Sequence, residues 1–273
     1  MVCLQTLGKI LLFFDVKMEV PPMYGWFHIL FLILPIVIAI ILCKLRKHPD
    51  ERFMRRLMLI VSVMVLIFEI YKQINYTFKY DGYVINSDYP WYIFPFQFCS
   101  TPLYIGFLVA FTKKGKLHDA FCAYLATFAP FAGLCVLLYP PQVFVATLGI
   151  NIQSMICHGV MVTVSIYLFY TGYVKAEHKT ILKAIPVFAV CVSLAMIMND
   201  IAYACGILEK ETFNMFFISP YCEPSLPVYS LIQAVVPFPW CVIIYILGFS
   251  CAAYIMLLIP IAVKHIANKI PKR

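Results

Sequence analysis

Charged residues are scarce in this sequence. Only 12% of its 273 residues are charged, 63% are hydrophobic, and the mean hydropathy is +0.89. Soluble domains carry about 25% charged residues, so this composition excludes them and indicates an integral membrane protein. The connections between apolar runs are short, and the chain is therefore predicted to form a single transmembrane domain over residues 1–273.

Paired cysteine motifs and a cleavable leader are also missing. The eleven cysteines contain no CxxC spacing, which argues against a zinc site or a disulfide framework. The sequence thus predicts no metal and no cofactor. Cys205 and Cys222 bracket the longest outer loop and are the one pair considered for a disulfide. The apolar residues 10–14 are not followed by a small-residue cleavage site, so they are interpreted as an interfacial segment.

Long apolar runs dominate what remains. A helix needs about 20 apolar residues to cross the hydrocarbon core of a bilayer. The runs of this length predict an all-α, seven-transmembrane-helix bundle with spans near residues 26–43, 57–77, 91–111, 118–138, 149–171, 184–206 and 229–260.

The basic residues are distributed unevenly around these spans. Sixteen of the 21 Lys and Arg residues fall in alternate connections and in the tail, four on the opposite side and one, Lys72, within a span. Lys and Arg concentrate in cytoplasmic loops, so we expect the N-terminus outside and the C-terminus in the cytoplasm. This asymmetry explains the net charge of +8. It predicts anionic headgroups at the cytoplasmic face as partners and no nucleic acid.

Ionisable and polar residues inside the spans mark the candidate site, because such groups are unfavourable in a bilayer. Glu69 and Lys72 are three residues apart and share one helix face, either as a packing pair or as part of a site. His158 belongs to a polar stripe in the fifth span and is the candidate base for a thiol. Cys99 is that thiol, within the polar run QFCSTP at residues 97–102.

Depth along the helices relates these residues to one another. At about 1.5 Å per residue, Cys99, His158, Glu69, Lys72 and Asn199 all lie roughly 8–14 Å below the outer ends of their spans. They are therefore predicted to share one layer, with His28 above it at the outer mouth. In a regular helix Gln97 and Cys99 point to different faces. Either the third span is distorted at Pro102 or Gln97 lies outside the pocket of Cys99.

Several short motifs occur in order along most of the chain. They are PMYGWFH at 22–28, EIYK at 69–72, PFQFC at 95–99, CHGV at 157–160, Asn199, NMFF at 214–217 and PFPW at 237–240. With these motifs the sequence resembles the YwaF-like bacterial integral membrane proteins, relatives of the TMEM-164 type membrane acyltransferases. The resemblance implies a multi-pass protein of the bacterial plasma membrane that acts on membrane phospholipids.

The resemblance further implies acyl transfer by Cys99 and His158. His158 would take the thiol proton, and the thiolate would attack a glycerolipid ester to give an acyl-thioester. Asn199 or Lys72 would stabilise the oxyanion, with Glu69 as an orienting residue and Gln97 and His28 as further supporting residues. The alternatives are a small-solute or proton-coupled transporter and a non-catalytic lipid-binding protein. The absence of an internal repeat argues against a transporter.

Overall fold

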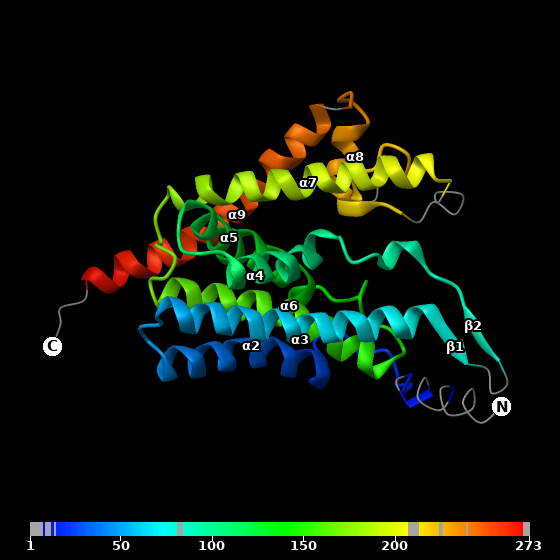
Figure 1. The fold of residues 1–273 in the computed structure, drawn as a ribbon, viewed down its shortest axis with the longest axis horizontal. Helices are drawn as coiled ribbons and strands as arrows, with labels where there is room; N and C mark the ends of the chain where they lie inside the picture. The colour runs from blue at the N-terminus through cyan, green and yellow to red at the C-terminus, as the bar shows by residue number, and fades with distance from the viewer. Residues whose placement is uncertain are drawn as a thin grey trace.

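The computed structural model is an all-α membrane-type fold (Figure 1). It describes residues 8, 12–13, 15–80, 84–206, 213–223, 226–238 and 240–269. Most of the predicted interfacial segment 10–14 lies outside the described residues, as do Lys9, Lys210, Lys272 and Arg273. Within the described part of the chain, six helices are long and apolar enough to cross a membrane.

Five of the predicted spans correspond closely to long helices. These are α2 (Trp26–Leu45), α3 (Glu51–Thr77), α5 (Lys116–Leu138), α6 (Leu148–Tyr170) and α7 (Thr180–Ala204). The largest difference is at the start of α3, which begins six residues before the predicted span because Asp50 caps it. The Asp50 carboxylate accepts a hydrogen bond of 2.7 Å from the Phe53 amide.

The predicted span 91–111 is not a continuous helix. It consists of two 3₁₀ turns, η1 (Trp91–Ile93) and η2 (Phe98–Ser100), followed by the short helix α4 (Thr101–Phe111). Pro95 has no amide hydrogen, and its ring restricts the preceding residue to extended backbone. Hydropathy detects the apolar run but not this interruption. The third span is therefore distorted, as one of the two alternatives allowed, but the irregular backbone precedes Thr101 and is not a kink at Pro102.

The predicted span 229–260 is also divided. The short helix α8 (Pro227–Gln233) precedes a break at Pro237, and the long helix α9 runs from Trp240 to Lys269. Pro is well suited to end a helix and to precede the next one. The last long helix therefore begins eleven residues later than predicted and extends nine residues further.

Two pairings near one end of the bundle were not predicted. The strands β1 (Phe78–Tyr80) and β2 (Ile85–Ser87) form an antiparallel hairpin after α3, with Lys79 opposite Asn86. An isolated bridge joins Lys17 to Thr147 and ties the segment before α2 to the α5–α6 connection. In Figure 1 the hairpin lies at the end opposite the α2–α3 connection.

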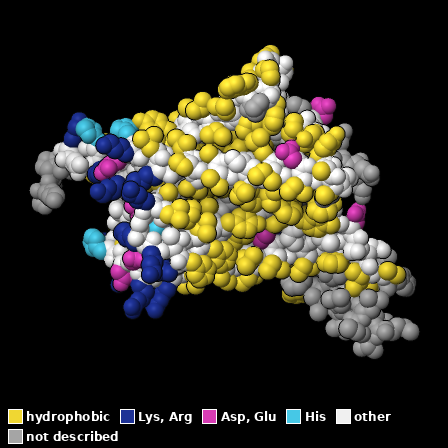
Figure 2. Space-filling model, turned by 45° about the horizontal axis from the view of Figure 1, so that its top comes forward, with side chains coloured by type: hydrophobic (Ala, Val, Ile, Leu, Met, Phe, Trp, Pro, Cys, Tyr) yellow, Lys and Arg dark blue, Asp and Glu magenta, His cyan; other side chains and the backbone are white. Residues whose placement is uncertain are grey.

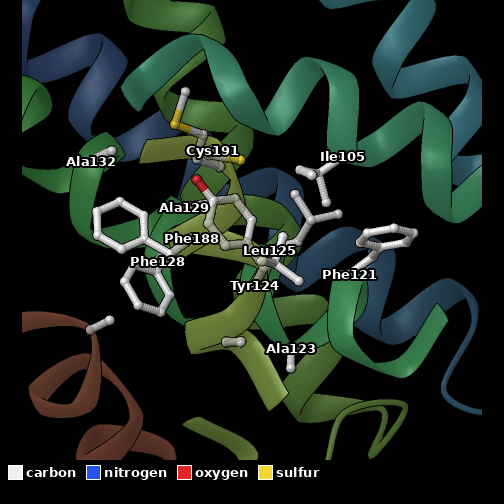
Figure 3. Packing of buried hydrophobic residues seen from close by; sticks show 14 of the residues in the cluster. Ile105, Phe121, Ala123, Tyr124, Leu125, Phe128, Ala129, Ala132, Phe188 and Cys191 are labelled. Atoms are coloured by element: carbon white, nitrogen blue, oxygen red, sulfur yellow. The ribbon is translucent and has the colours of Figure 1, made fainter. Parts of the chain in front are cut away.

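The core is built around α5, which packs against α4, α6, α7 and α9. Tyr124 and Phe128 stack at 5.5 Å between ring centroids, and Phe128 stacks on Phe188 at 4.6 Å (Figure 3). All three side chains are fully buried. Outward-facing Ile, Leu and Val side chains of α2, α3 and α9 are exposed instead, as is suitable for contact with lipid tails.

Basic residues are concentrated at one end of the long axis of the molecule. Figure 2 shows Lys and Arg side chains gathered at one end of a broad apolar belt. These residues come from the α2–α3, α4–α5 and α6–α7 connections and the end of α9. The β1–β2 hairpin and the α5–α6 connection lie at the other end (Figure 1).

Candidate active site

A polar cavity of about 200 Å³ lies between α3, the irregular segment before α4, the α5–α6 connection and α6. Its walls include four of the seven residues that the sequence singled out: Glu69, Lys72, Cys99 and His158. Gln97, Asn199 and His28 do not line it. The cavity lies toward the end of the bundle opposite the basic loops, since it is lined by the last turns of α3 and the first turns of α6.

Cys99 lies in η2, two residues before α4 begins. The thiol is therefore close in sequence to a helix N-terminus, where backbone dipoles favour an anion. Pro102 occupies the first turn of α4, where no intrahelical bond is lost. The Phe98 carbonyl is satisfied by the amide and the hydroxyl of Thr101, the latter at 2.8 Å. The backbone around Cys99 is thus a defined turn and not a kinked helix.

The turn is anchored from behind by the Phe98 side chain. Its ring contacts Phe188 at 5.2 Å, Phe249 at 5.3 Å and Phe216 at 6.0 Å between centroids. Thr101 adds a second anchor, because its hydroxyl oxygen lies 2.5 Å from the Tyr124 hydroxyl oxygen, within hydrogen-bonding distance. Aromatic packing on one side of the turn leaves Cys99 on the cavity side.

His158 has one ring nitrogen engaged and one without a protein partner. Nδ1 lies 2.6 Å from the Ser154 carbonyl oxygen one turn earlier in α6. A carbonyl only accepts hydrogen bonds, so we assign the proton to Nδ1. Nε2 is buried and has no hydrogen-bond partner. With this tautomer, Nε2 carries a free lone pair, as a general base requires.

Glu69 and Lys72 form an ion pair of 2.8 Å whose side chains are 10% and 18% exposed. Gln73 donates to the same Glu69 oxygen at 2.6 Å and to the Ile93 carbonyl at 2.9 Å. Tyr89 in turn donates to Gln73 at 2.8 Å. Burial, together with the negative charge of Glu69, raises the pKa of Tyr89, which keeps its hydroxyl protonated as a donor. This network fixes Lys72 at the cavity wall and holds η1 against α3.

Gln97 and Asn199 hold a loop in place. Gln97 bonds the Asn214 carbonyl and the Phe216 amide, each at 2.9 Å. Asn199 donates to the Met215 carbonyl at 3.1 Å and accepts from the Met215 amide at 2.8 Å. Both side-chain amides are therefore occupied by the backbone of the 3₁₀ turn η4 (Met215–Phe217). Through Phe216, which packs against Phe98, this loop contacts the turn that contains Cys99.

His28 is fully buried and has a partner at both ring nitrogens. Nδ1 accepts from the Tyr24 amide at 2.8 Å, and Nε2 lies 2.6 Å from the Leu137 carbonyl. The second nitrogen must carry the proton, since a carbonyl cannot donate. His28 therefore joins the start of α2 to the end of α5 and is not brought to the cavity.

The cavity also contains Ser154, a member of the predicted polar stripe of the fifth span, and two residues that sequence reasoning missed. These are Gln153 and Cys157, which lie on α6 beside His158, and Gln153 donates to the Cys157 sulfur at 3.6 Å. Their spacing gave a usable signal, because 153 and 157 are four apart, as are 154 and 158. Gln73, which donates to Glu69, was also not predicted. Cys205 and Cys222 are both free thiols in the structure.

The described residues contain no cluster of three or more His, Cys, Asp or Glu placed to hold a metal ion. The chemistry available at the cavity is that of a thiol, an imidazole with a free nitrogen, and a fixed ammonium group.

The long apolar helices, which surround the polar cavity, define a multi-pass all-α membrane protein. The model of the TMEM164 family matches residues 23–259, which includes every residue of the cavity, and the chain belongs to this family. None of the curated proteins and none of the solved structures shows a significant match to the chain.

Proposed function

We propose that the protein is a membrane-embedded acyltransferase or lipid hydrolase that forms an acyl-thioester on Cys99, with His158 as general base. The observation that carries this proposal is the shared cavity. Cys99 and His158 lie in its wall, and the free Nε2 of His158 has no competing protein donor. A nucleophile and an available base in one site are the minimum for covalent acyl transfer.

The reaction proceeds in two balanced steps. His158 Nε2 takes the Cys99 proton, a bond forms between Sγ and the ester carbonyl carbon, and the ester C–O bond breaks. The departing lysolipid oxygen receives the proton from His158. An acceptor hydroxyl, amine or water then gives its proton to His158 and attacks the thioester, and Cys99 leaves as the thiolate and is reprotonated.

Lys72 is the preferred group for stabilising the oxyanion. Its ammonium group is fixed at the cavity wall by Glu69 at 2.8 Å, and a fixed positive charge stabilises negative charge that develops in the transition state. Asn199 is unsuited to this role because both atoms of its amide bind Met215. Gln153 lines the same cavity and is a second donor.

We also infer the orientation in the membrane from the charge separation. The end that carries the basic loops is cytoplasmic by the positive-inside rule, so the N-terminus and the cavity lie toward the outer leaflet. The segment 91–111 would then complete a seventh crossing, partly as irregular backbone. Such backbone is tolerated at membrane depth where it lines a cavity or is buried in protein. Donor phospholipids reach Cys99 from the outer leaflet of what we infer to be a bacterial plasma membrane.

The first prediction concerns the thioester. The purified protein incubated with phospholipid should carry an acyl adduct on Cys99 that hydroxylamine removes at neutral pH. Cys99→Ala should abolish the adduct, and His158→Ala should reduce it by roughly 100-fold or more, as expected for loss of a general base. Mass spectrometry of digested protein identifies the modified cysteine.

Two controls sharpen this experiment. Cys251 is exposed on α9 and does not line the cavity, so Cys251→Ala should retain the adduct. Cys157 also lines the cavity. An adduct that survives Cys99→Ala but disappears in Cys157→Ala would show that Cys157, and not Cys99, is the nucleophile.

The buried Glu69–Lys72 pair favours one alternative, transport of a small polar solute or proton, because buried charges often mark such pathways. Flux through proteoliposomes containing Cys99→Ala separates the two. Solute flux in Cys99→Ala that equals wild-type flux, together with the absence of an acyl adduct on the wild-type protein, would favour transport over acyl transfer.

A further inference from the structure

A narrow apolar slot adjoins the polar cavity on its basic-end side. It lies between α3, α4, α5 and α6. The slot and the cavity share four wall residues, Val65, Cys99, Leu103 and Cys157. Cys99 therefore lies where a polar space meets an apolar one.

The slot is oriented along the bundle axis. On α3 it extends from Val65 back to Met58, and on α6 from Cys157 forward to Val164. Each segment comprises eight residues of helix, and its ends are about 10 Å apart. The walls along this length are apolar apart from Ser62, so the slot suits a hydrocarbon chain and not a headgroup.

The slot is narrow, with a free volume of about 30 Å³. A Cβ atom on Gly106 would overlap the Ser62 side chain, so α3 and α4 approach as closely as their side chains allow. Met58 and Met161 contribute flexible thioether side chains to the wall, and methionine adapts easily to the shape of a neighbour. A chain would be admitted by rotation of these side chains.

A wider apolar groove of about 310 Å³ lies beside the slot, at the same depth, between α2, α3 and α6. The slot and the groove share Val61, Val160 and Val164. The slot therefore has the polar cavity at one end and the groove along one side, and the three valines form the second junction, which is the boundary between slot and groove.

We propose that the slot and the groove bind the acyl chain of the ester that Cys99 attacks, and that Val61 and Val160 set which chains are accepted. This inference rests on the proposed function for its substrate. Because the ester carbonyl must lie at Cys99, its chain is directed into the apolar slot, which shares Cys99 with the cavity. The headgroup and glycerol remain on the side of Lys72 and Gln153.

The first part of the test compares opposite changes at one position. Val160→Phe should narrow the second junction and Val160→Ala should widen it. With a mixture of phospholipids of different chain lengths, the ratio of long to short chains on Cys99 should fall about tenfold or more in Val160→Phe and rise in Val160→Ala, because one methylene in an apolar pocket changes discrimination by about 10-fold to 200-fold. Val61→Phe acts from the opposite wall and should repeat the Val160→Phe result if that variant folds poorly.

The second part of the test does not depend on acyl transfer. In Cys99→Ala protein, a phospholipid with a diazirine at the end of its acyl chain should label the groove residues Met64 and Met155, and Val160→Phe should reduce this labelling about tenfold. Labelling confined to lipid-facing residues such as Ile60 and Ile67 would overturn the acyl-chain site. An unchanged chain profile together with a normal Cys99 adduct would overturn it while leaving the proposed function intact. Groove labelling with no adduct in any variant would reject the chemistry and retain the binding site.

Discussion

One carboxylate oxygen of Glu69 accepts two hydrogen bonds, from Lys72 and from Gln73. The side chains of the ion pair are mostly buried, so each charge depends on the other to remain charged within the protein. The pair lies in the wall of the cavity that contains Cys99 and His158. Its geometry therefore affects both the stability of α3 and the position of the one cation in reach of the proposed reaction.

Removal of one partner tests this dependence. Glu69→Gln should lower the free energy of unfolding in detergent by about 2 kcal/mol, because it leaves Lys72 without its counterion. Lys72→Met should show a similar loss, and the double variant should lose clearly less than the sum of the two. Strict additivity would mean that the two side chains do not interact.

The sequence predicted the depth of a side chain in the membrane but not which neighbouring helix the side chain faces. Cys99, His158, Glu69 and Lys72 were assigned to one layer, and the structure places them around one cavity. Asn199 was assigned to the same layer, yet its amide turns to Met215. Depth along the membrane normal follows from counting residues, whereas rotation about that normal depends on which helices are neighbours.

The turn η4 shows how an element far from the cavity in sequence supports it. Phe216 and Phe217 have φ angles of 58° and 56°, which are unfavourable for bulky residues. The hydrogen bonds from Gln97, Asn199 and Tyr245 hold the turn in this conformation. The strained turn in turn packs against Phe98, next to Cys99.

Loss of these anchors should therefore have two effects. Gln97→Leu and Asn199→Leu should each lower the free energy of unfolding by about 1–3 kcal/mol, since each leaves buried backbone groups unpaired. Gln97→Leu should also change the alkylation rate of Cys99, measured by peptide mapping after brief exposure to iodoacetamide. Asn86→Ala, on the exposed face of the hairpin, is the matched control and should change neither. If Gln97→Leu lowers the stability but leaves the alkylation rate of Cys99 unchanged, η4 does not influence the thiol.

Hydropathy located the long helices well because each is a continuous apolar run. It failed at 91–111 and at 229–240, where prolines interrupt the helix within apolar sequence. Pro95 and Pro237 lie within these apolar runs, but a proline in such a run marks either a kink or a helix end. Which of the two occurs depends on partners such as the Tyr104 hydroxyl, which donates to the Pro95 carbonyl at 2.6 Å.

Across the whole molecule, the segment before α2 is tied to the connection that borders the cavity. The Met18 amide donates to the Ala146 carbonyl, and the Leu148 amide donates to the Val16 carbonyl. Asp15 reinforces this contact through Thr147 at 3.3 Å and an ion pair with Lys17 at 2.7 Å. Burial alone would raise the pKa of Asp15, but the hydrogen bond and charge of Lys17, with the charge of Lys79, hold it below its usual value.

The pH dependence follows from this shift. A carboxylate whose pKa is lower in the folded than in the unfolded state stabilises the fold above the unfolded pKa of about 3.9 and loses that effect as pH falls through its folded pKa. Asp15→Asn should therefore lower the melting temperature at pH 7 by an amount equivalent to less than about 1 kcal/mol, because Lys17 is largely exposed. The difference from wild type should be constant above the unfolded pKa and decrease as the pH falls below it. A difference that does not decrease on acidification would assign the effect to an interaction that does not need the charge, such as the hydrogen bond with Thr147.

The short helix α4 has a consequence for biosynthesis. Its eleven residues extend about 16 Å, roughly half of the hydrocarbon thickness. A segment this short, preceded by irregular backbone, is a poor substrate for independent release from the translocon into lipid. We therefore expect it to enter the bilayer together with a neighbour, and α3 and α5 both pack against it. On this expectation, the thiol of Cys99 reaches its place only when at least two helices have been delivered to the bilayer as one unit.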